Sequence, residues 1–152
     1  TDGVALARQY RLPRRIDDFI LEHHGTMITR YQFNKAIEAA GGNASKVDKE
    51  NFRYPGPRPR SRETALLMLA DGVEARARAE RPQDEEALRK VVLSTIESAQ
   101  KQGQFDNTQL TLRDLSIITE SFVNVLRGTH HPRVSYPKEE SAVTNVLTAP
   151  RK

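Results

Sequence analysis

Two adjacent histidines are the first residues whose type and position could support chemistry. Residues 22–26 read EHHGT, and His23 and His24 are two of only four histidines in the chain. Imidazole nitrogens bind divalent metals and exchange protons near neutral pH. Neighbouring side chains on a helix point about 100° apart, so such a pair rarely shares an ion in mid-helix. At a helix end the chain can turn and bring both rings together, and the helix dipole there favours positive charge. Two interpretations stay open: metal ligands, or one core histidine beside a solvated one.

A carboxylate in an apolar segment is the second candidate. Asp71 lies in LLMLADGVEA. Burying a carboxylate is costly unless it is paired, hydrogen-bonded or bound to a metal ion. We expect either a structural partner among the arginines of residues 58–62 or a functional role for Asp71. The adjacent Gly72 costs about 1 kcal/mol relative to alanine inside a helix, so we also expect another element to pack closely there.

Four arginines lie on the proline-stiffened stretch RYPGPRPRSR: Arg53, Arg58, Arg60 and Arg62. The planar guanidinium group matches the geometry of phosphate oxygens. Near a metal site these side chains would form a phosphate pocket, and far from one they would be a solvated loop. The second histidine pair, His130 and His131, lies in LRGTHHPRVSYP before a proline, and we assign it to a loop.

Composition removes several classes of function. The chain has no cysteine, and it shows neither a glycine-rich phosphate loop nor a GxSxG motif, so covalent catalysis has no candidate nucleophile. If the chain is an enzyme, metal-activated water is the natural chemistry. The net charge is +4, but basic and acidic residues are interspersed, so we expect no general nucleic-acid surface. No apolar run approaches the roughly 18 residues of a membrane span.

Helical periodicity covers the N-terminal segments that carry the histidines. We expect a short helix over about residues 1–10 and a second one after Pro13. In the second helix Ile16, Phe19, Ile20 and His23 fall on one face. Gly25 suits the position just past its end, where positive φ is common.

The remaining residues predict a long loop and three further helices. Residues 41–61 contain glycines and prolines that break any period, so we expect a long ordered loop that Phe52 and Tyr54 anchor to the core. The next helix begins at Ser61 or Thr64 and runs through about Ala79. Another begins near residues 84–86 and ends at Gly103, with this apolar stripe: Leu88, Val91, Val92, Thr95, Ile96 and Ala99. The last begins at Thr111, with Asp114 in a capping-box position, and ends at Gly128. Its inward residues should be Leu115, Ile118, Phe122, Val125 and Leu126. The fold class is all-α.

Four segments, in order, resemble one protein family. They are DGVALARQYRLPRRIDDFILEHHGT, NFRYPGPRPRSRETALLMLADGVEARAR, GQFDNTQLTLRDL and LRGTHHPRVSYP. They are similar to the cytosolic HD domain of the seven-transmembrane HD phosphohydrolases, which hydrolyse cyclic di-AMP in bacteria. EHHGT, FRYPGP and the Asp71 segment are the most specific parts of the resemblance.

The resemblance implies an all-α HD domain with a two-metal centre of iron or manganese. It assigns His23 and His24 to the histidines of the family's HHGT motif, and Asp71 to the aspartate that completes the centre. Two metal ions about 4 Å apart would activate water and hold the phosphodiester for in-line attack, giving the linear dinucleotide. The arginines of residues 53–62 are phosphate candidates on their own chemistry and are not family positions.

One part of the family pattern does not occur in these 152 residues, because the chain contains no His-Asp dipeptide. The family places that dipeptide and an earlier histidine upstream of the matched segment. We therefore expect residues 1–137 to be the C-terminal part of an HD domain and residues 138–152 to be a polar, frayed tail. Alone, the chain should hold metal incompletely and be inactive.

The same resemblance predicts partners and a location. Apolar surface should be exposed, and it should pair with the missing N-terminal part of the HD domain or with a second copy of the chain. The chain should be soluble, and the parent protein should hold it on the cytoplasmic side of the membrane. The alternative to a phosphodiesterase fragment is a non-catalytic module that binds a nucleotide or regulates a partner. A weaker alternative is nucleic-acid binding through residues 53–62, which predicts steep salt dependence.

Overall fold

The computed structural model describes residues 2–129, and that part of the chain is helical, as predicted. The α-helices are α1 (Asp2–Gln9), α2 (Arg15–Glu22), α3 (Arg30–Ala39), α4 (Arg62–Glu80), α5 (Glu85–Lys101) and α6 (Leu112–Thr129). Two short 3-10 helices, η1 (Ala44–Lys46) and η2 (Lys49–Phe52), follow α3. The sequence patterns predicted all of these α-helices except α3. None of the helices within residues 2–129 has both the length and the hydropathy that a membrane crossing requires.

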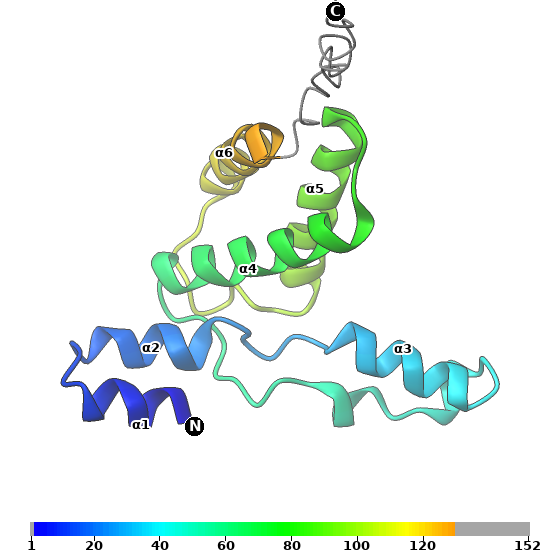
Figure 1. The fold of residues 1–152 in the computed structure, drawn as a ribbon, viewed down its shortest axis with the longest axis horizontal. Coiled ribbons are helices and arrows are strands. Elements are labelled where there is room, and N and C mark those ends of the chain that lie inside the picture. Colours follow the sequence, from blue (N-terminus) through cyan, green and yellow to red (C-terminus); the bar gives the residue numbers. More distant parts are fainter. Residues whose placement is uncertain (1, 130–152) are drawn as a thin grey trace, which may run out of the picture.

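Helices α4, α5 and α6 form the body of the molecule, with α5 packed against both of the others (Figure 1). Every residue of the predicted α5 stripe is buried. Val92 meets Leu69 and Val73 of α4 and Val123 of α6 in the main core. Full burial of such a side chain stabilises the fold by about 1.5–3 kcal/mol, so this contact fixes α4, the helix that carries Asp71.

Gly72 of α4 lies against α5, which confirms the predicted close packing. A Cβ atom at this position would lie 3.3 Å from Cγ2 of Thr95. Glycine therefore lets α5 approach α4 closely beside Asp71.

Local capping defines the starts of the long helices. At α4 the Ser61 hydroxyl accepts a hydrogen bond from the Thr64 amide, and the Thr64 hydroxyl accepts one from the Ser61 amide. At α6 the Asp114 carboxylate accepts from the Thr111 amide at 2.9 Å, and the Thr111 hydroxyl accepts from the Asp114 amide at 3.1 Å. Both capping arrangements satisfy amide groups that have no partner inside the helix, and both agree with the predicted helix starts.

The prediction that Val125 of α6 faces the core was wrong. Val125 is 63% exposed, whereas Val123 is fully buried. Two positions along a helix differ by about 200°, so the burial of Val123 turns Val125 toward solvent.

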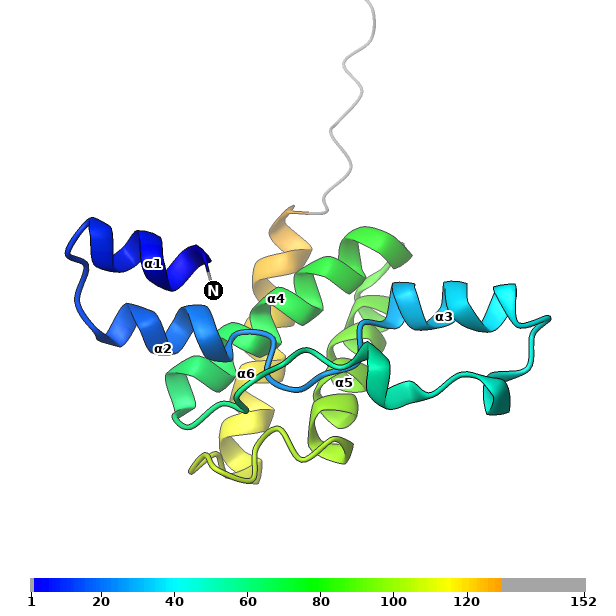
Figure 2. The same ribbon diagram turned by 90° about the horizontal axis from the view of Figure 1, so that it is seen from below.

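Two smaller units flank the body. Helices α1 and α2 pack against each other, and α2 also contacts α4. On the opposite side, α3 and the 3-10 helices form an arm, residues 30–52, that extends away from α1 (Figure 2). The Phe33 and Phe52 rings meet inside the arm, 5.5 Å apart. Phe52 therefore holds the arm together, and the prediction that it anchors the loop to the main core was wrong.

A pair of extended segments joins the arm to the body. The Thr29 amide donates to the Phe52 carbonyl at 2.8 Å, and the Tyr54 amide donates to the Met27 carbonyl at 3.0 Å. Between them, Ile28 and Arg53 form an isolated antiparallel bridge. This pairing places Tyr54 next to the segment that follows the histidine pair.

Candidate metal and substrate site

The histidine pair lies where α2 ends. Glu22 is the last helical residue, and the chain turns through residues 23–26. Gly25 has φ +53°, the predicted positive value, and its amide donates to the Glu22 carbonyl at 2.9 Å. The turn brings the two imidazole rings to a centroid distance of 4.0 Å. The two neighbouring histidine rings thus lie next to each other because α2 ends at this point.

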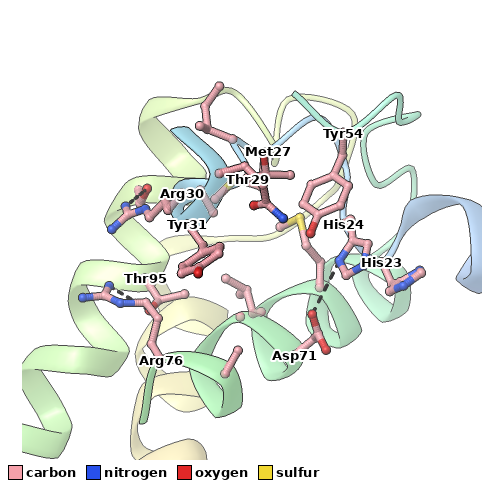
Figure 3. Close-up of a pocket in the computed structure, with 18 residues that line it drawn as sticks. His23, His24, Met27, Thr29, Arg30, Tyr31, Tyr54, Asp71, Arg76 and Thr95 are labelled. Carbon is pink, nitrogen blue, oxygen red and sulfur yellow. Dashed lines mark hydrogen bonds and ion pairs between the residues drawn. The ribbon is translucent and has the colours of Figure 1, made fainter. Parts of the chain in front are cut away.

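The His24 ring faces the carboxylate of Asp71 on α4 (Figure 3). Nδ1 of His24 lies 3.5 Å from Oδ2 of Asp71, which is long for a hydrogen bond between charged groups. Two donors that bind one ion through bonds of about 2.1 Å lie roughly 3.0–3.5 Å apart. The separation therefore fits a pair of ligands to a common metal ion.

His23 is oriented by its own helix. Its Nδ1 lies 2.9 Å from the Ile20 carbonyl oxygen and 3.2 Å from that of Phe19. Only a nitrogen that carries a hydrogen can donate to a carbonyl, so the geometry assigns a hydrogen to Nδ1 and leaves Nε2 as the nitrogen that a metal ion could use. A carbonyl partner of this kind orients metal-binding histidines.

His24 is oriented by an aromatic ring. Tyr54 stacks on it at a centroid distance of 4.2 Å and an interplanar angle of 21°. Burial lowers the pKa of His24 from its usual 6.5, the neighbouring His23 lowers it further, and Asp71 opposes the change. The lowered pKa favours the neutral imidazole, which is the form that binds metal ions.

The predicted burial of Asp71 was wrong. Its side chain is 50% exposed, and Leu67, one turn earlier on α4, is 41% exposed. Within residues 2–129 this side of α4 is left largely uncovered, so the apolar neighbours in the sequence do not enclose the carboxylate. The nearest basic partner is also His24 rather than an arginine of residues 58–62.

A pocket of about 370 Å³ opens beside these side chains. His23, His24, Tyr54 and Asp71 line one end of it. Two arginines line it as well: Arg30 of α3, which donates to Ser98 at 2.6 Å, and Arg76 of α4, which donates to Ser94 at 2.7 Å. The arginines that line this pocket therefore lie on helices α3 and α4, and not on the loop that was predicted to supply them.

The four arginines predicted to contact phosphate lie elsewhere. None of them lines the pocket beside His24. Three form ion pairs with nearby carboxylates: Arg53 with Glu50, Arg58 with Asp106 and Arg62 with Asp114. Arg60 contributes its backbone amide to Glu22. Their contact with substrate phosphate stays a prediction.

The donors present in residues 2–129 fit part of a metal centre. His24 and Asp71 have the spacing of two ligands, and the His23 ring lies beside them. No three histidine, cysteine or acidic side chains in this range gather closely enough to hold an ion by themselves. The pair His130 and His131 and the predicted tail, residues 138–152, lie outside the described residues.

Three residues at this site were not assigned to it from the sequence. Tyr54 was expected only to anchor a loop. Glu22 lies three residues after Phe19, on the inward side of α2, and that spacing was a usable signal. Gln104 follows α5 and carries no local signal for this role, because its bonds to Thr26 span 78 positions of the chain.

The helical fold of residues 2–129 is that of the HD domains of known phosphodiesterases. The sequence of the chain matches no family model. It is 34% identical over 143 residues to the cyclic-di-AMP phosphodiesterase PgpH of Bacillus subtilis. This match covers 94% of this chain and 20% of that protein. It is 38% identical over 151 residues to an uncharacterized protein of Synechocystis, covering 99% of this chain and 18% of that protein.

A solved structure agrees with the sequence relatives. The HD domain of Listeria monocytogenes PgpH in complex with cyclic di-AMP superimposes with a TM-score of 0.77 at 29% identity, covering 89% of this chain and 62% of that one. The chain is thus homologous to the PgpH phosphodiesterases and has the fold of their HD domain. It spans about a fifth of the length of the curated relatives it matches.

Proposed function

We propose that this chain forms part of the active site of a metal-dependent phosphodiesterase that hydrolyses cyclic di-AMP to the linear dinucleotide. The homologous PgpH proteins are named for this activity. The observation that carries the proposal is the 3.5 Å approach of His24 to Asp71 at a pocket that His23 also lines. Two residues far apart in sequence supply donors to one point.

The side chains have separate roles in this proposal. His23, His24 and Asp71 hold divalent ions, iron or manganese. When bound, the metal pair supplies activated water and positive charge at the phosphodiester. Tyr54 keeps the His24 ring in one plane. Arg30 adds positive potential to the pocket, which attracts an anionic dinucleotide, whereas the charge of Arg76 is already paired with Glu80 at 2.8 Å.

The rest of the HD domain is the proposed partner of this chain. A two-ion centre takes more donors than these three residues supply, and the chain matches only 62% of the solved HD domain. We assign residues 1–137 to the C-terminal part of the domain, on the cytoplasmic side of the membrane in the parent protein. The half-exposed side of α4 around Leu67 and Asp71 is a surface for that partner or for a second copy.

The test compares metal content and hydrolysis of cyclic di-AMP in a protein that contains the whole HD domain. His24→Ala and Asp71→Ala should each lower bound metal and reduce hydrolysis by about 100-fold or more, because even loss of the groups that orient ligands costs about 10–100-fold. Glu74→Ala is the matched control, because Glu74 is an exposed carboxylate on α4 that does not line the pocket. Unchanged metal content and activity in both site variants would refute the ligand assignment.

Nucleotide binding without cleavage is the second candidate function. It is favoured by the absence of a three-donor cluster within residues 2–129, next to a pocket that is already formed. Calorimetry of the 152-residue chain with cyclic di-AMP, in the presence of a chelator, separates the two functions. Tight binding without metal supports the second function, and no heat of binding removes it.

A further inference from the structure

Two buried polar side chains lie at the two ends of the turn that carries the histidines. Glu22, just before His23, is 2% exposed, and Gln104 is fully buried. Neither side chain lines the pocket beside His24. Polar groups are buried at a cost unless they are hydrogen-bonded, so the partners of these two side chains show what they hold in place.

Glu22 ties the end of α2 to the beginning of α4. Its Oε2 accepts a hydrogen bond from the Arg60 amide at 2.8 Å and another from the Thr64 hydroxyl at 2.7 Å. Thr64 also belongs to the capping box that starts α4, and it is fully buried. Asp71 lies two turns further along the same helix. The carboxylate of Glu22 therefore sets the position of the histidine turn relative to Asp71.

Gln104 holds the other end of the turn. Its Oε1 accepts from the Thr26 amide at 2.9 Å, and its Nε2 donates to the Thr26 hydroxyl at 2.9 Å and to the Gln102 carbonyl at 2.9 Å. One side-chain amide thus binds both the backbone and the side chain of Thr26. Gln102 continues the contact, because its Oε1 accepts from the Ile28 amide at 3.3 Å.

The glycine of the motif makes this contact sterically feasible. A Cβ atom on Gly25 would lie 2.2 Å from Oε1 of Gln104 and 3.2 Å from the sulfur of Met68. The segment HHGT therefore combines two candidate ligands, a glycine that admits Gln104, and a threonine that Gln104 binds.

We propose that Glu22 and Gln104 are positioning residues of the metal site, which clamp the two ends of the HHGT turn so that His24 meets Asp71 and His23 lies beside His24. This inference rests on the proposed function for its metal-binding consequence. The clamp itself is a statement about ring positions, which can be measured without metal.

The experiment uses the 152-residue chain and four variants. Glu22→Leu and Gln104→Met keep similar volumes and lose the hydrogen bonds. Glu22→Gln keeps an oxygen that can accept from Arg60 and Thr64. Thr119→Val is the control, because it removes the hydrogen bond of a buried hydroxyl, 2.8 Å from the Leu115 carbonyl on α6, away from the turn.

Two measurements are compared across these variants. The first is the nuclear Overhauser effect between the His24 and Tyr54 rings in metal-free protein. The second is the Mn²⁺ concentration that broadens the imidazole signals of His23 and His24. Loss of groups that orient metal ligands typically lowers metal affinity about 10–100-fold.

We expect Glu22→Leu and Gln104→Met to weaken the ring contact and to lower Mn²⁺ affinity by that factor. Glu22→Gln should restore both, and Thr119→Val should lose stability with both unchanged. A wild-type ring contact in Glu22→Leu and Gln104→Met would overturn the proposal, even if these variants are less stable. If the wild-type chain shows no Mn²⁺ broadening, its three donors do not hold the ion without the rest of the HD domain, and the ring contact alone still decides whether the clamp exists.

Discussion

Replacing Gly25 with alanine tests the turn most directly, because two separate costs can be worked out for it. The first is conformational: φ is +53°, and a left-handed conformation costs a residue with a side chain about 1–2 kcal/mol. The second is steric: the new Cβ would lie 2.2 Å from Oε1 of Gln104. Gln104 must then move and leave the Thr26 amide without its acceptor, which costs about 1–3 kcal/mol for a buried donor.

The expected loss is therefore about 2–5 kcal/mol, against the roughly 5–15 kcal/mol by which a typical domain is stable. Gly41→Ala is the matched control. Gly41 also has a positive φ, +72°, but a Cβ there would meet nothing within 4 Å. It should lose only the conformational part. Equilibrium unfolding in urea, followed by circular dichroism, measures both losses.

Equal losses in Gly25→Ala and Gly41→Ala would refute the reasoning, because the steric part would then be absent. A double-mutant cycle gives a second check. In the Gln104→Ala background only the flexible Met68 side chain stays near the new Cβ, with its sulfur 3.2 Å away, so Gly25→Ala should cost about 1–2 kcal/mol. Strict additivity of the two substitutions would contradict the close contact.

Three further predictions concern the site and the core. Burial lowers the pKa of His24, so protonation favours the unfolded chain, where the pKa is near 6.5. The contribution of His24 to the free energy of unfolding should be fully present above about pH 6.5 and should be lost as the pH falls through the lower pKa of the folded state. Thermal unfolding measured at about pH 7.5 and at about pH 5.5 should therefore differ less in His24→Gln than in wild type. Tyr54→Leu should lose about 0.5–1.5 kcal/mol of ring stacking in urea unfolding, whereas Tyr54→Phe keeps it. Leu69→Ala should cost about 2–5 kcal/mol because Leu69 is 1% exposed, and Leu66→Ala, at a position 41% exposed, should cost less than about 1 kcal/mol in the same assay.

The clamped turn gives a physical account of why the histidines are adjacent. Within a helix, His23 and His24 would point about 100° apart. The chain leaves the helix at Glu22 and reverses through Gly25, and the two rings then lie 4.0 Å apart. Adjacency is useful only at such a turn, and the turn depends on contacts with α4 and with the segment after α5.

The arm and the pocket show how the long loop serves the site. The loop was predicted to be ordered, and its extended segment after Phe52 brings Tyr54 onto His24. Arg30, at the start of α3, lines the same pocket. By contrast, three of the four arginines that the sequence offered as phosphate ligands form ion pairs with nearby carboxylates: Arg53, Arg58 and Arg62.

Local interactions made much of the fold predictable from the sequence. The stripe of α5 and the caps at Ser61 and Thr111 depend on residues within a few positions of each other. So do the reversals at Gly25 and Gly103, where φ is +53° and +66°. Periodicity, capping and positive φ are properties of short segments, and the structure confirms the helices that they predicted.

Tertiary packing decided the rest. The sequence could not show that Asp71 stays half exposed, that Val125 faces outward, or that Gln104 reaches Thr26, because each depends on which distant segment covers a given face. The approach of His24 to Asp71 depends on the same packing, through the contact of α2 with α4. Side-chain types and local spacing thus determined which residues could act, and the burial of apolar surface between distant helices determined which of them meet.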